Sequence, residues 1–250
     1  MLPAQRLILL SNQYLTLRRR ADAAAIRNGA MLLYGGMGAD AAGNLFQENT
    51  PTTSAMDGSV VGYMRDVSGS GYHGTQTTNK PTVEVVNGVY AVRFNGASNR
   101  LSTTFPQPTS DFTFIAAITP DASATGVIFN GGAFSVQFQK TTDTNLAQAK
   151  PNVGAQLNAT TPAGGVPVVV SSRKQGTARS LYVNGTLGGS DTSAVDFTGT
   201  GAYSIGANTA GASWLAMRGF LFCMCNAAMS DADRIAIERF GAFLARASYG

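Results

Sequence analysis

Residues 180–187 read SLYVNGTL, and this segment decides the architecture expected for the chain. Leu181 and Val183 alternate with other residues, and the dipeptide Asn184-Gly185 that follows tolerates the positive φ angles of a two-residue hairpin turn. Upstream, valines alternate in the same way over residues 166–170. The spacing therefore predicts antiparallel strands joined by tight turns.

Other segments repeat this pattern. Asn87-Gly88 separates two alternating runs and predicts a second hairpin, and the apolar run Met217–Cys225 is typical of a strand buried on both faces. We also expect strands at residues 30–34, 112–118, 134–139 and 203–206. Turn residues recur about every ten positions, and that spacing favours a β-sandwich or jelly roll.

The composition is typical of one compact β domain. The 250 residues are 44% hydrophobic and only 13% charged, and 29 are glycine, a balance unlike that of disordered chains. No apolar run approaches the ~20 residues of a membrane span, and Leu7–Leu10 is shorter than the core of a secretory signal. We therefore expect no membrane partner and no targeting segment. Cys223 and Cys225 fall on the same face of one strand, which predicts buried free thiols.

The first 28 residues differ from the rest in charge. They contain five arginines and one aspartate, a net charge of +4 that equals the net charge of the whole chain. Residues 4–27 are predicted to be helical, ending at Asn28-Gly29, with one apolar stripe at three- and four-residue spacing. Two interpretations stay open. The helix packs on its own domain, or it docks onto a sister subunit or larger assembly with the arginine triplet 18–20 facing an acidic surface.

A second helix is predicted at the C-terminal end. Ser230 is a typical N-cap, carboxylates at Asp231 and Asp233 suit the first turn, and an apolar stripe continues to about residue 246. At about 1.5 Å per residue the helix is about 25 Å long, enough to lie along one sheet edge or beside the N-terminal helix. The expected fold class is all-β: an antiparallel jelly-roll sandwich with an N-terminal helical arm and a C-terminal helix. We expect the arm and its junction at 1–44, and the sandwich with its helix at 45–250.

Several short motifs occur in an order that resembles the concanavalin A-like lectin/laminin G-like jelly roll, above all the version in structural proteins of tailed bacteriophages. The matching pieces are Leu45–Glu48 with Thr50–Thr53, Arg65–Gly69 with Tyr72–Gln76, Val92–Gly96 leading to Leu101, Leu181–Gly185, and Met229-Ser230 before Glu238–Phe240. The resemblance covers residues 45–247 and implies a place in a virion. Because this fold serves both glycan binders and glycan hydrolases, it leaves the activity to be argued from the residues.

The residues argue against an enzyme. Glycosidases of this fold class need two carboxylates that flank the glycosidic bond, and Glu48, Glu84 and Glu238 lie far apart in the sequence. An unfamiliar aspartate pair stays open. His73 is the only histidine, and its glycine-rich loop favours a structural role over a Ser-His-Asp arrangement. Neither cysteine belongs to a Cys/His cluster with zinc spacing.

Signals for small ligands are weaker. Asp66, Asp191 and Asp196 show no calcium-loop spacing, so we predict no cofactor and leave calcium as an alternative. Residues 69–74 match G-x-G-x-x-G, but a helix that would bind a pyrophosphate does not follow, so we interpret them as a tight connection.

For sugars, the usual platform is an exposed aromatic ring, and Trp214 is the candidate, with Tyr203 and Tyr72 lining the same site. A lone tryptophan in a sandwich is more often part of the core.

We therefore expect a non-enzymatic structural protein, located in the virion of a tailed phage as head decoration, fibre or tail component. The residues expected to dock on other virion proteins, or to join copies into a homo-oligomer such as a trimer, are Leu7, Leu10, Tyr14, Leu17, Arg18, Arg19 and Arg20. Weak binding of a host surface glycan would then gain from multivalency. The alternatives are a glycan-binding receptor protein and, less favoured, a polysaccharide hydrolase. Four net charges with one interleaved tyrosine are a thin footprint for nucleic acid, which we do not expect as a partner.

Overall fold

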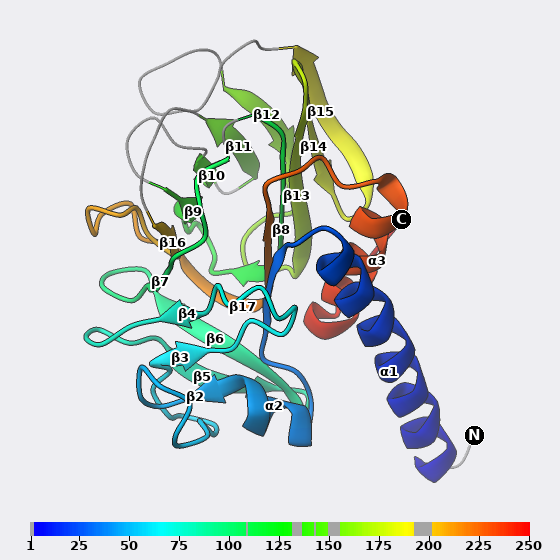
Figure 1. Ribbon diagram of the computed structural model, residues 1–250, viewed down its shortest axis with the longest axis vertical. Helices are drawn as coiled ribbons and strands as arrows, with labels where there is room; N and C mark the ends of the chain where they lie inside the picture. The colour runs from blue at the N-terminus through cyan, green and yellow to red at the C-terminus, as the bar shows by residue number, and fades with distance from the viewer. Residues whose placement is uncertain (1–2, 109, 132–136, 143, 150–155, 193–201) are drawn as a thin grey trace.

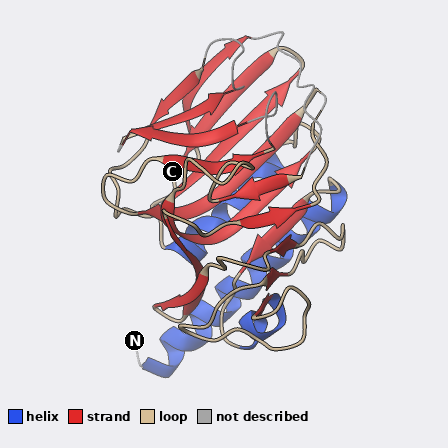
Figure 2. Ribbon diagram, turned by 90° about the vertical axis from the view of Figure 1, so that its left-hand side faces the viewer, coloured by secondary structure: helices blue, strands red, loops and turns tan. Residues whose placement is uncertain are grey.

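The computed structural model describes residues 3–108, 110–131, 137–142, 144–149, 156–192 and 202–250. Two antiparallel sheets pack face to face, and two long helices cover the outer face of one sheet (Figures 1 and 2). The predicted fold class, an all-β antiparallel sandwich with an N-terminal and a C-terminal helix, is confirmed.

The helix-covered sheet has the order β15-β14-β13-β8-β17-β6-β5, and β1 also pairs with β17. Its strands are β1 (Met31–Tyr34), β5 (Thr82–Val86), β6 (Val89–Asn95), β8 (Phe112–Pro120), β13 (Val168–Gln175), β14 (Ala178–Val183), β15 (Thr186–Thr192) and β17 (Ala216–Cys225). The second sheet has the order β12-β11-β10-β9-β16-β7-β4-β3-β2. Its strands are β2 (Leu45–Phe46), β3 (Tyr63–Met64), β4 (Gly74–Thr75), β7 (Leu101–Thr103), β9 (Gly126–Asn130), β10 (Gln137–Thr142), β11 (Asn145–Ala149), β12 (Leu157–Thr160) and β16 (Tyr203–Ile205).

Both predicted Asn-Gly hairpins are present. Asn184 and Gly185 have φ angles of 51° and 84° and join β14 to β15. Asn87 and Gly88 have φ angles of 52° and 80° and join β5 to β6. Positive φ at both central positions is the geometry of the twisted two-residue turn, which matches the twist of the flanking strands.

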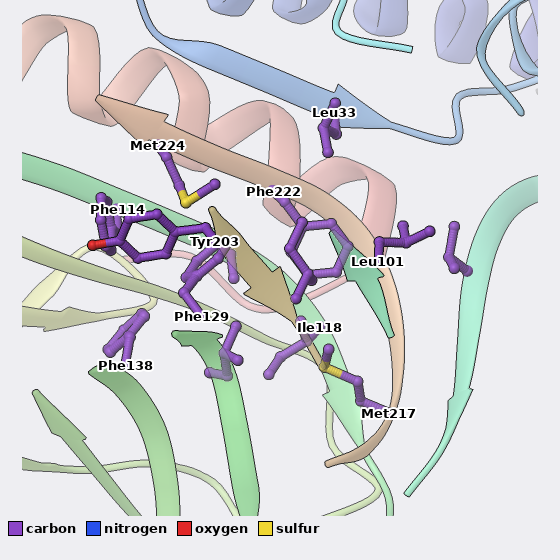
Figure 3. Packing of buried hydrophobic residues seen from close by; sticks show 14 of the residues in the cluster. Leu33, Leu101, Phe114, Ile118, Phe129, Phe138, Tyr203, Met217, Phe222 and Met224 are labelled. Carbon is purple, nitrogen blue, oxygen red and sulfur yellow. The ribbon is translucent and has the colours of Figure 1, made fainter. Parts of the chain in front are cut away.

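Strand β17 lies between two cores, as its unbroken apolar run predicts. Met217, Phe222 and Met224 point into the core between the sheets, where Figure 3 shows them. Cys223 and Cys225 point to the opposite side, into the core beneath the helices. Both cysteines are buried and free, so that prediction is confirmed.

The helices are α1 (Pro3–Arg27), α2 (Ala39–Asn44) and α3 (Asp231–Ala245). Helix α3 begins as predicted, because the Ser230 hydroxyl accepts a hydrogen bond from the backbone N–H of Asp233 at 3.2 Å. Ile237, Phe240 and Leu244 are buried beneath it. Of the two placements considered, α3 lies beside α1, and it covers a face of the sheet rather than its edge (Figure 1). None of the helices in the described part of the chain is long and apolar enough to cross a membrane.

Three element boundaries differ from expectation. Strand β1 precedes the expected start of the sandwich at residue 45, yet it pairs with β17 along its whole length, so the sandwich includes Met31–Tyr34. Strand β8 continues to Pro120, two residues beyond the predicted end. Residues 137–139 of the strand predicted at 134–139 lie in β10, and residues 134–136 lie outside the described residues.

Candidate docking site on the helical arm

Helix α1 has two halves with different surroundings. It runs antiparallel to α3: Arg27 pairs with Asp233 near one end, and the rings of Tyr14 and Phe240 are 5.8 Å apart near the other. The buried side chains on this face of α1 are Tyr14, Ala21, Ala24 and Ala25. On the N-terminal side of Tyr14, the helix projects beyond α3 (Figures 1 and 2). We call residues 3–13 the projecting half and residues 14–27 the packed half.

A polar network fastens the packed half to the domain. Arg18 donates from Nη1 to Oδ2 of Asp40 at 2.6 Å and from Nε to the Tyr34 hydroxyl at 2.9 Å. Tyr14 donates to the same Asp40 oxygen at 2.7 Å, and Tyr34 donates to Asp22 at 3.3 Å. Burial raises the pKa of the Tyr14 and Tyr34 hydroxyls, and it raises the pKa of the Asp22 carboxyl against the opposing effect of Arg18.

The residues predicted for docking therefore divide into two groups. Tyr14 and Arg18 contact their own domain, so the expectation that they face a partner is wrong, because β1 and the α2 segment bring acceptors to this side of α1. Arg19 and Arg20 are exposed, and neither forms a hydrogen bond or ion pair with the described residues. Leu10 is 40% exposed. Leu17 is half-buried, and Leu7 lies in the helix with its side chain outside the described part.

Two apolar grooves flank the projecting half. One, of about 450 Å³, lies between α1 and the C-terminal end of α3, and its lining includes Leu10, Leu17, Met37 and Phe243. The other, of about 510 Å³, faces α2 and the turn at residues 87–88, and its lining includes Leu10, Leu15 and Met37. Leu15 is also 40% exposed. Apolar side chains that gather in this way on a surface are typical of interaction sites.

Part of this apolar surface could not be predicted from the sequence. Leu15 lies off the apolar stripe, so helical periodicity gave no reason to choose it. Met37 and Phe243 come from the α2 junction and from α3, and only the tertiary fold places them beside Leu10.

Tyr203, one of the three predicted sugar-binding aromatics, is in the core. Its ring is fully buried and packs beside Phe114 (Figure 3), with 5.3 Å between the ring centroids, and its hydroxyl donates to Gln107 at 2.9 Å. A ring in this position cannot stack on a sugar, so this prediction is wrong. The reason is the register of β16, which points Tyr203 at the opposite sheet.

The other two aromatics have different neighbours. Tyr72 is half-buried and packs edge-on against Phe105, at 5.2 Å between ring centroids. Trp214 is half-buried in the loop after β16, where a methyl group in place of the Gly211 hydrogen would lie 3.5 Å from the indole and 3.8 Å from Nη1 of Arg100. Trp214 is thus only half-buried, and Arg100 approaches the same glycine.

The three glutamates are engaged at separate places. Glu48 accepts a hydrogen bond from Thr52 in its own loop. Glu84 pairs with Arg218 across the helix-covered sheet at 2.8 Å. Glu238 is fully buried and accepts a hydrogen bond from Nη1 of Arg234 at 2.6 Å. This arrangement does not supply the pair of glutamates that flanks a glycosidic bond.

An aspartate near Glu84 also has an arginine partner. Asp121 forms hydrogen bonds of 2.6 and 2.5 Å with the two terminal nitrogens of Arg93, and these bonds lower the pKa of Asp121. A glycosidase needs one carboxyl group whose pKa is raised so that it stays protonated. The pKa of Asp121 is lowered instead, so this carboxyl group does not meet the requirement.

Asp66 and His73 organise the glycine-rich connection. The Asp66 carboxylate accepts from the backbone N–H of Leu32 at 3.0 Å, from the hydroxyl of Ser68 at 2.7 Å and from the backbone N–H of Tyr72 at 3.1 Å. Nδ1 of His73 accepts from the backbone N–H of Asp66 at 3.0 Å, and burial lowers the pKa of His73. These contacts agree with the structural role predicted for His73.

The calcium alternative finds little support in the described residues. The oxygens of Asp66 already accept protein hydrogen bonds, and Asp191 pairs with Arg179. Asp196 lies outside the described residues. Within the described part of the chain, three or more His, Cys, Asp or Glu side chains do not gather at one place in a way that could hold a metal ion.

Comparisons with known proteins show a likeness of fold. No protein-family model and no curated protein sequence matches the chain. Among solved structures, a Trypanosoma rangeli sialidase in complex with 2,3-difluoro-KDN is similar with a TM-score of 0.55 and 14% identity, over 85% of this chain and 32% of that one. The same sialidase in complex with sialic acid has a TM-score of 0.54 and 14% identity, over 96% of this chain and 39% of that one. The binding domain of Paraclostridial Mosquitocidal Protein 1 has a TM-score of 0.51 and 16% identity, over 72% of this chain and 50% of that one.

The chain thus spans between about a third and a half of these structures. At such identities the likeness concerns the fold alone, and it agrees with the lectin-like jelly-roll sandwich that the sequence motifs predict.

Proposed function

We propose that the protein is a non-enzymatic structural protein of a larger assembly, the virion of a tailed bacteriophage, and that the projecting half of α1 attaches it there. The observation that carries the proposal is the contrast within one helix. One face of the packed half is buried and hydrogen-bonded, whereas the projecting half presents Leu10 beside two apolar grooves, one of which continues to Leu15 just past the boundary between the halves.

Leaving this part of the helix without a partner has a free-energy cost. A helical segment of about three turns is marginal in water by itself, and exposed leucines lose the stabilisation of burial. A partner that fills the grooves would stabilise this part of the helix and would bury the exposed leucines. The virion as the location rests on the motif resemblance, and display as a homo-oligomer follows from the many copies in which such proteins occur. The absence of enzymatic activity is supported by the separate engagement of Glu48, Glu84 and Glu238.

Attachment can be measured by co-sedimentation with phage particles prepared without this protein. We expect the full-length chain to sediment with the particles and a variant lacking residues 1–12 to remain in the supernatant. A deletion of residues 1–28 is unsuitable because it would remove the buried Ala21 and Ala24. The double variant Leu10→Glu/Leu15→Glu should behave like the truncation. Leu187→Glu is the matched control, since Leu187 is 53% exposed on β15, away from α1. Equal sedimentation of all variants would contradict the proposal.

Glycan binding is the second candidate, and the observation that favours it is the half-buried Trp214 in a loop where Arg100 approaches the same glycine, Gly211. An indole face can stack on a pyranose ring, and a guanidinium group suits an acidic sugar. The similar sialidase structure includes a complex with sialic acid, which is a property of that protein. Trp214→Ala should abolish retention on an immobilised polysaccharide panel, with Met56→Ala as an exposed apolar control. Release of reducing ends from the panel would instead indicate a hydrolase.

A further inference from the structure

A third groove, on the side of α1 that faces the N-terminal end of α3, combines an apolar floor with a basic rim. Its volume is about 370 Å³. Leu17 and Ala23 from α1, with Ile235 and Ala236 from α3, form the floor, and all four are half-buried. Figure 1 shows the two helices side by side, and residues of both line the groove. The floor therefore offers apolar surface that the chain itself does not cover.

The rim of this groove is formed largely by arginines. Arg19, Arg20 and Arg27 come from α1 and Arg239 from α3, and all four are exposed. One carboxylate, that of Asp233, also lines the groove, and it already pairs with Arg27. Three positive charges thus stand around an apolar floor without an acidic partner in the described residues. We call this surface the arginine groove.

We propose that the arginine groove binds an acidic amphipathic helix of a partner protein. This inference rests on the proposed attachment to a larger assembly and specifies the chemistry of the partner. A third helix that lies between two antiparallel helices can place its apolar stripe on the floor. Glutamates or aspartates that flank this stripe would then pair with the arginines, and guanidinium–carboxylate pairs form strong two-point hydrogen bonds. The apolar side chains of the partner helix would contact the floor, and its carboxylates would contact the arginines of the rim.

Nucleic acid fits this surface less well. Phosphates need the positive rim but gain nothing from a floor of Leu17, Ala23, Ile235 and Ala236. Bases stack on aromatic side chains, and the described lining contains none.

A second copy of the chain is also a poor occupant. Helix α1 has a single carboxylate, Asp22, and this group is already bonded to the network of Arg18 and Tyr34. In α3, Glu238 is buried, Asp233 is paired with Arg27, and the exposed Asp231 is paired with Arg173 and Arg234. The long helices therefore offer no acidic amphipathic face to another copy.

The test uses the full-length protein and a fluorescein-labelled synthetic peptide of about five helical turns, with leucines at i, i+3, i+4 and i+7 and glutamates on both sides of them. Its control is a peptide of the same composition in scrambled order. We expect the amphipathic peptide to bind at least tenfold more tightly by fluorescence anisotropy. Equal affinity for the two peptides would overturn the proposal, because it would mean attraction by charge alone.

Protein variants locate the site. Arg20→Glu/Arg239→Glu should weaken peptide binding at least tenfold, whereas Arg65→Glu/Lys80→Glu makes the same change of charge away from all three grooves and should weaken it less than threefold. Equal weakening by both pairs would place binding elsewhere. Displacement of the peptide by a DNA duplex at similar concentration would favour nucleic acid. Thermal unfolding monitors the fold of each variant.

The same variants separate this inference from the proposed function. If particles retain the Arg20→Glu/Arg239→Glu variant but lose Leu10→Glu/Leu15→Glu, attachment stands and the role of the arginine groove is refuted. If the peptide binds as expected while the Leu10 and Leu15 changes leave sedimentation unaltered, the groove stands and attachment through the projecting half is refuted.

Discussion

The two halves of α1 continue one apolar stripe, yet their surroundings differ. The packed half contacts β1, α2 and α3, and Arg18 ties it to residues that come from two other elements. The projecting half extends past the end of α3, and its Leu10 remains exposed. The difference teaches that helical periodicity identifies a face that must be covered, but the length of the neighbouring helix decides whether the chain covers that face itself.

The largest expected effect comes from deletions that cross the boundary between the halves. Removal of residues 1–28 takes away the cover of Leu32, Tyr34 and Phe240, so we expect no cooperative thermal unfolding transition by circular dichroism. Removal of residues 1–12 should leave the midpoint within about 3 °C of the full-length value, since a small change in free energy shifts it by only a few degrees. A comparable loss in both deletions would show that the projecting half is also structural.

A single acidic substitution in each half should distinguish the two halves of α1 nearly as clearly as the two deletions do. Ala24 is completely buried, so Ala24→Asp places a charge where it has no partner and should lower the free energy of unfolding by about 3 kcal/mol or more. Leu10→Asp should change it by less than about 0.5 kcal/mol, because the side chain is partly in water. Urea denaturation measures both values. A large loss for Leu10→Asp would mean that this leucine is already covered in solution.

The arginine triplet allows a finer comparison. Arg18→Ala removes hydrogen bonds to Asp40 and Tyr34 and should cost about 1–2 kcal/mol of unfolding free energy. Arg19→Ala should cost less than about 0.5 kcal/mol, as is usual at exposed sites without partners. A double-mutant cycle of Arg18→Ala with Asp40→Asn should give a coupling of about 1 kcal/mol. Independent effects of the two changes would show that the network does not fasten the helix.

The smallest effect concerns Asp22. Burial raises its folded-state pKa above the unfolded value of about 3.9, so folding favours the protonated carboxyl. The ionised group therefore opposes folding above the folded-state pKa, and this cost disappears as the pH falls through that pKa to the unfolded value. Asp22→Asn should thus be equal to the parent protein or up to about 1 kcal/mol more stable at pH 7, with the difference vanishing near pH 3.5. Destabilisation by Asp22→Asn at pH 7 would show instead that the pairing with Arg18 dominates.

Local signals predicted the local parts of this structure. The Asn-Gly turns, the Ser230 cap and the two-sided apolar strand β17 each depend on a few consecutive residues, and each is present as expected. Burial on both faces of β17 could be inferred because an unbroken apolar run has no other stable place in a sandwich.

Contacts between distant elements could not be predicted in this way. The acceptors for Arg18 come from β1 and α2, and the burial of Tyr203 depends on how β16 pairs with β7 and β9. Met37 and Phe243 reach the projecting half only through the complete fold. The order of short motifs indicated the fold class, whereas the candidate site emerged only from the packing of α1 on α3.

Hydrogen–deuterium exchange of α1 tests the central claim most directly. Exchange is measured in the free protein and again after the protein has been added to phage particles that were prepared without it. In the free protein we expect slow exchange over residues 14–27, because Tyr14, Ala21, Ala24 and Ala25 are packed, and fast exchange over residues 5–12. On particles, residues 5–12 should become protected while the exposed loops of the sandwich stay unchanged. Protection that appears in the sandwich and leaves residues 5–12 in fast exchange would contradict attachment through the projecting half of α1.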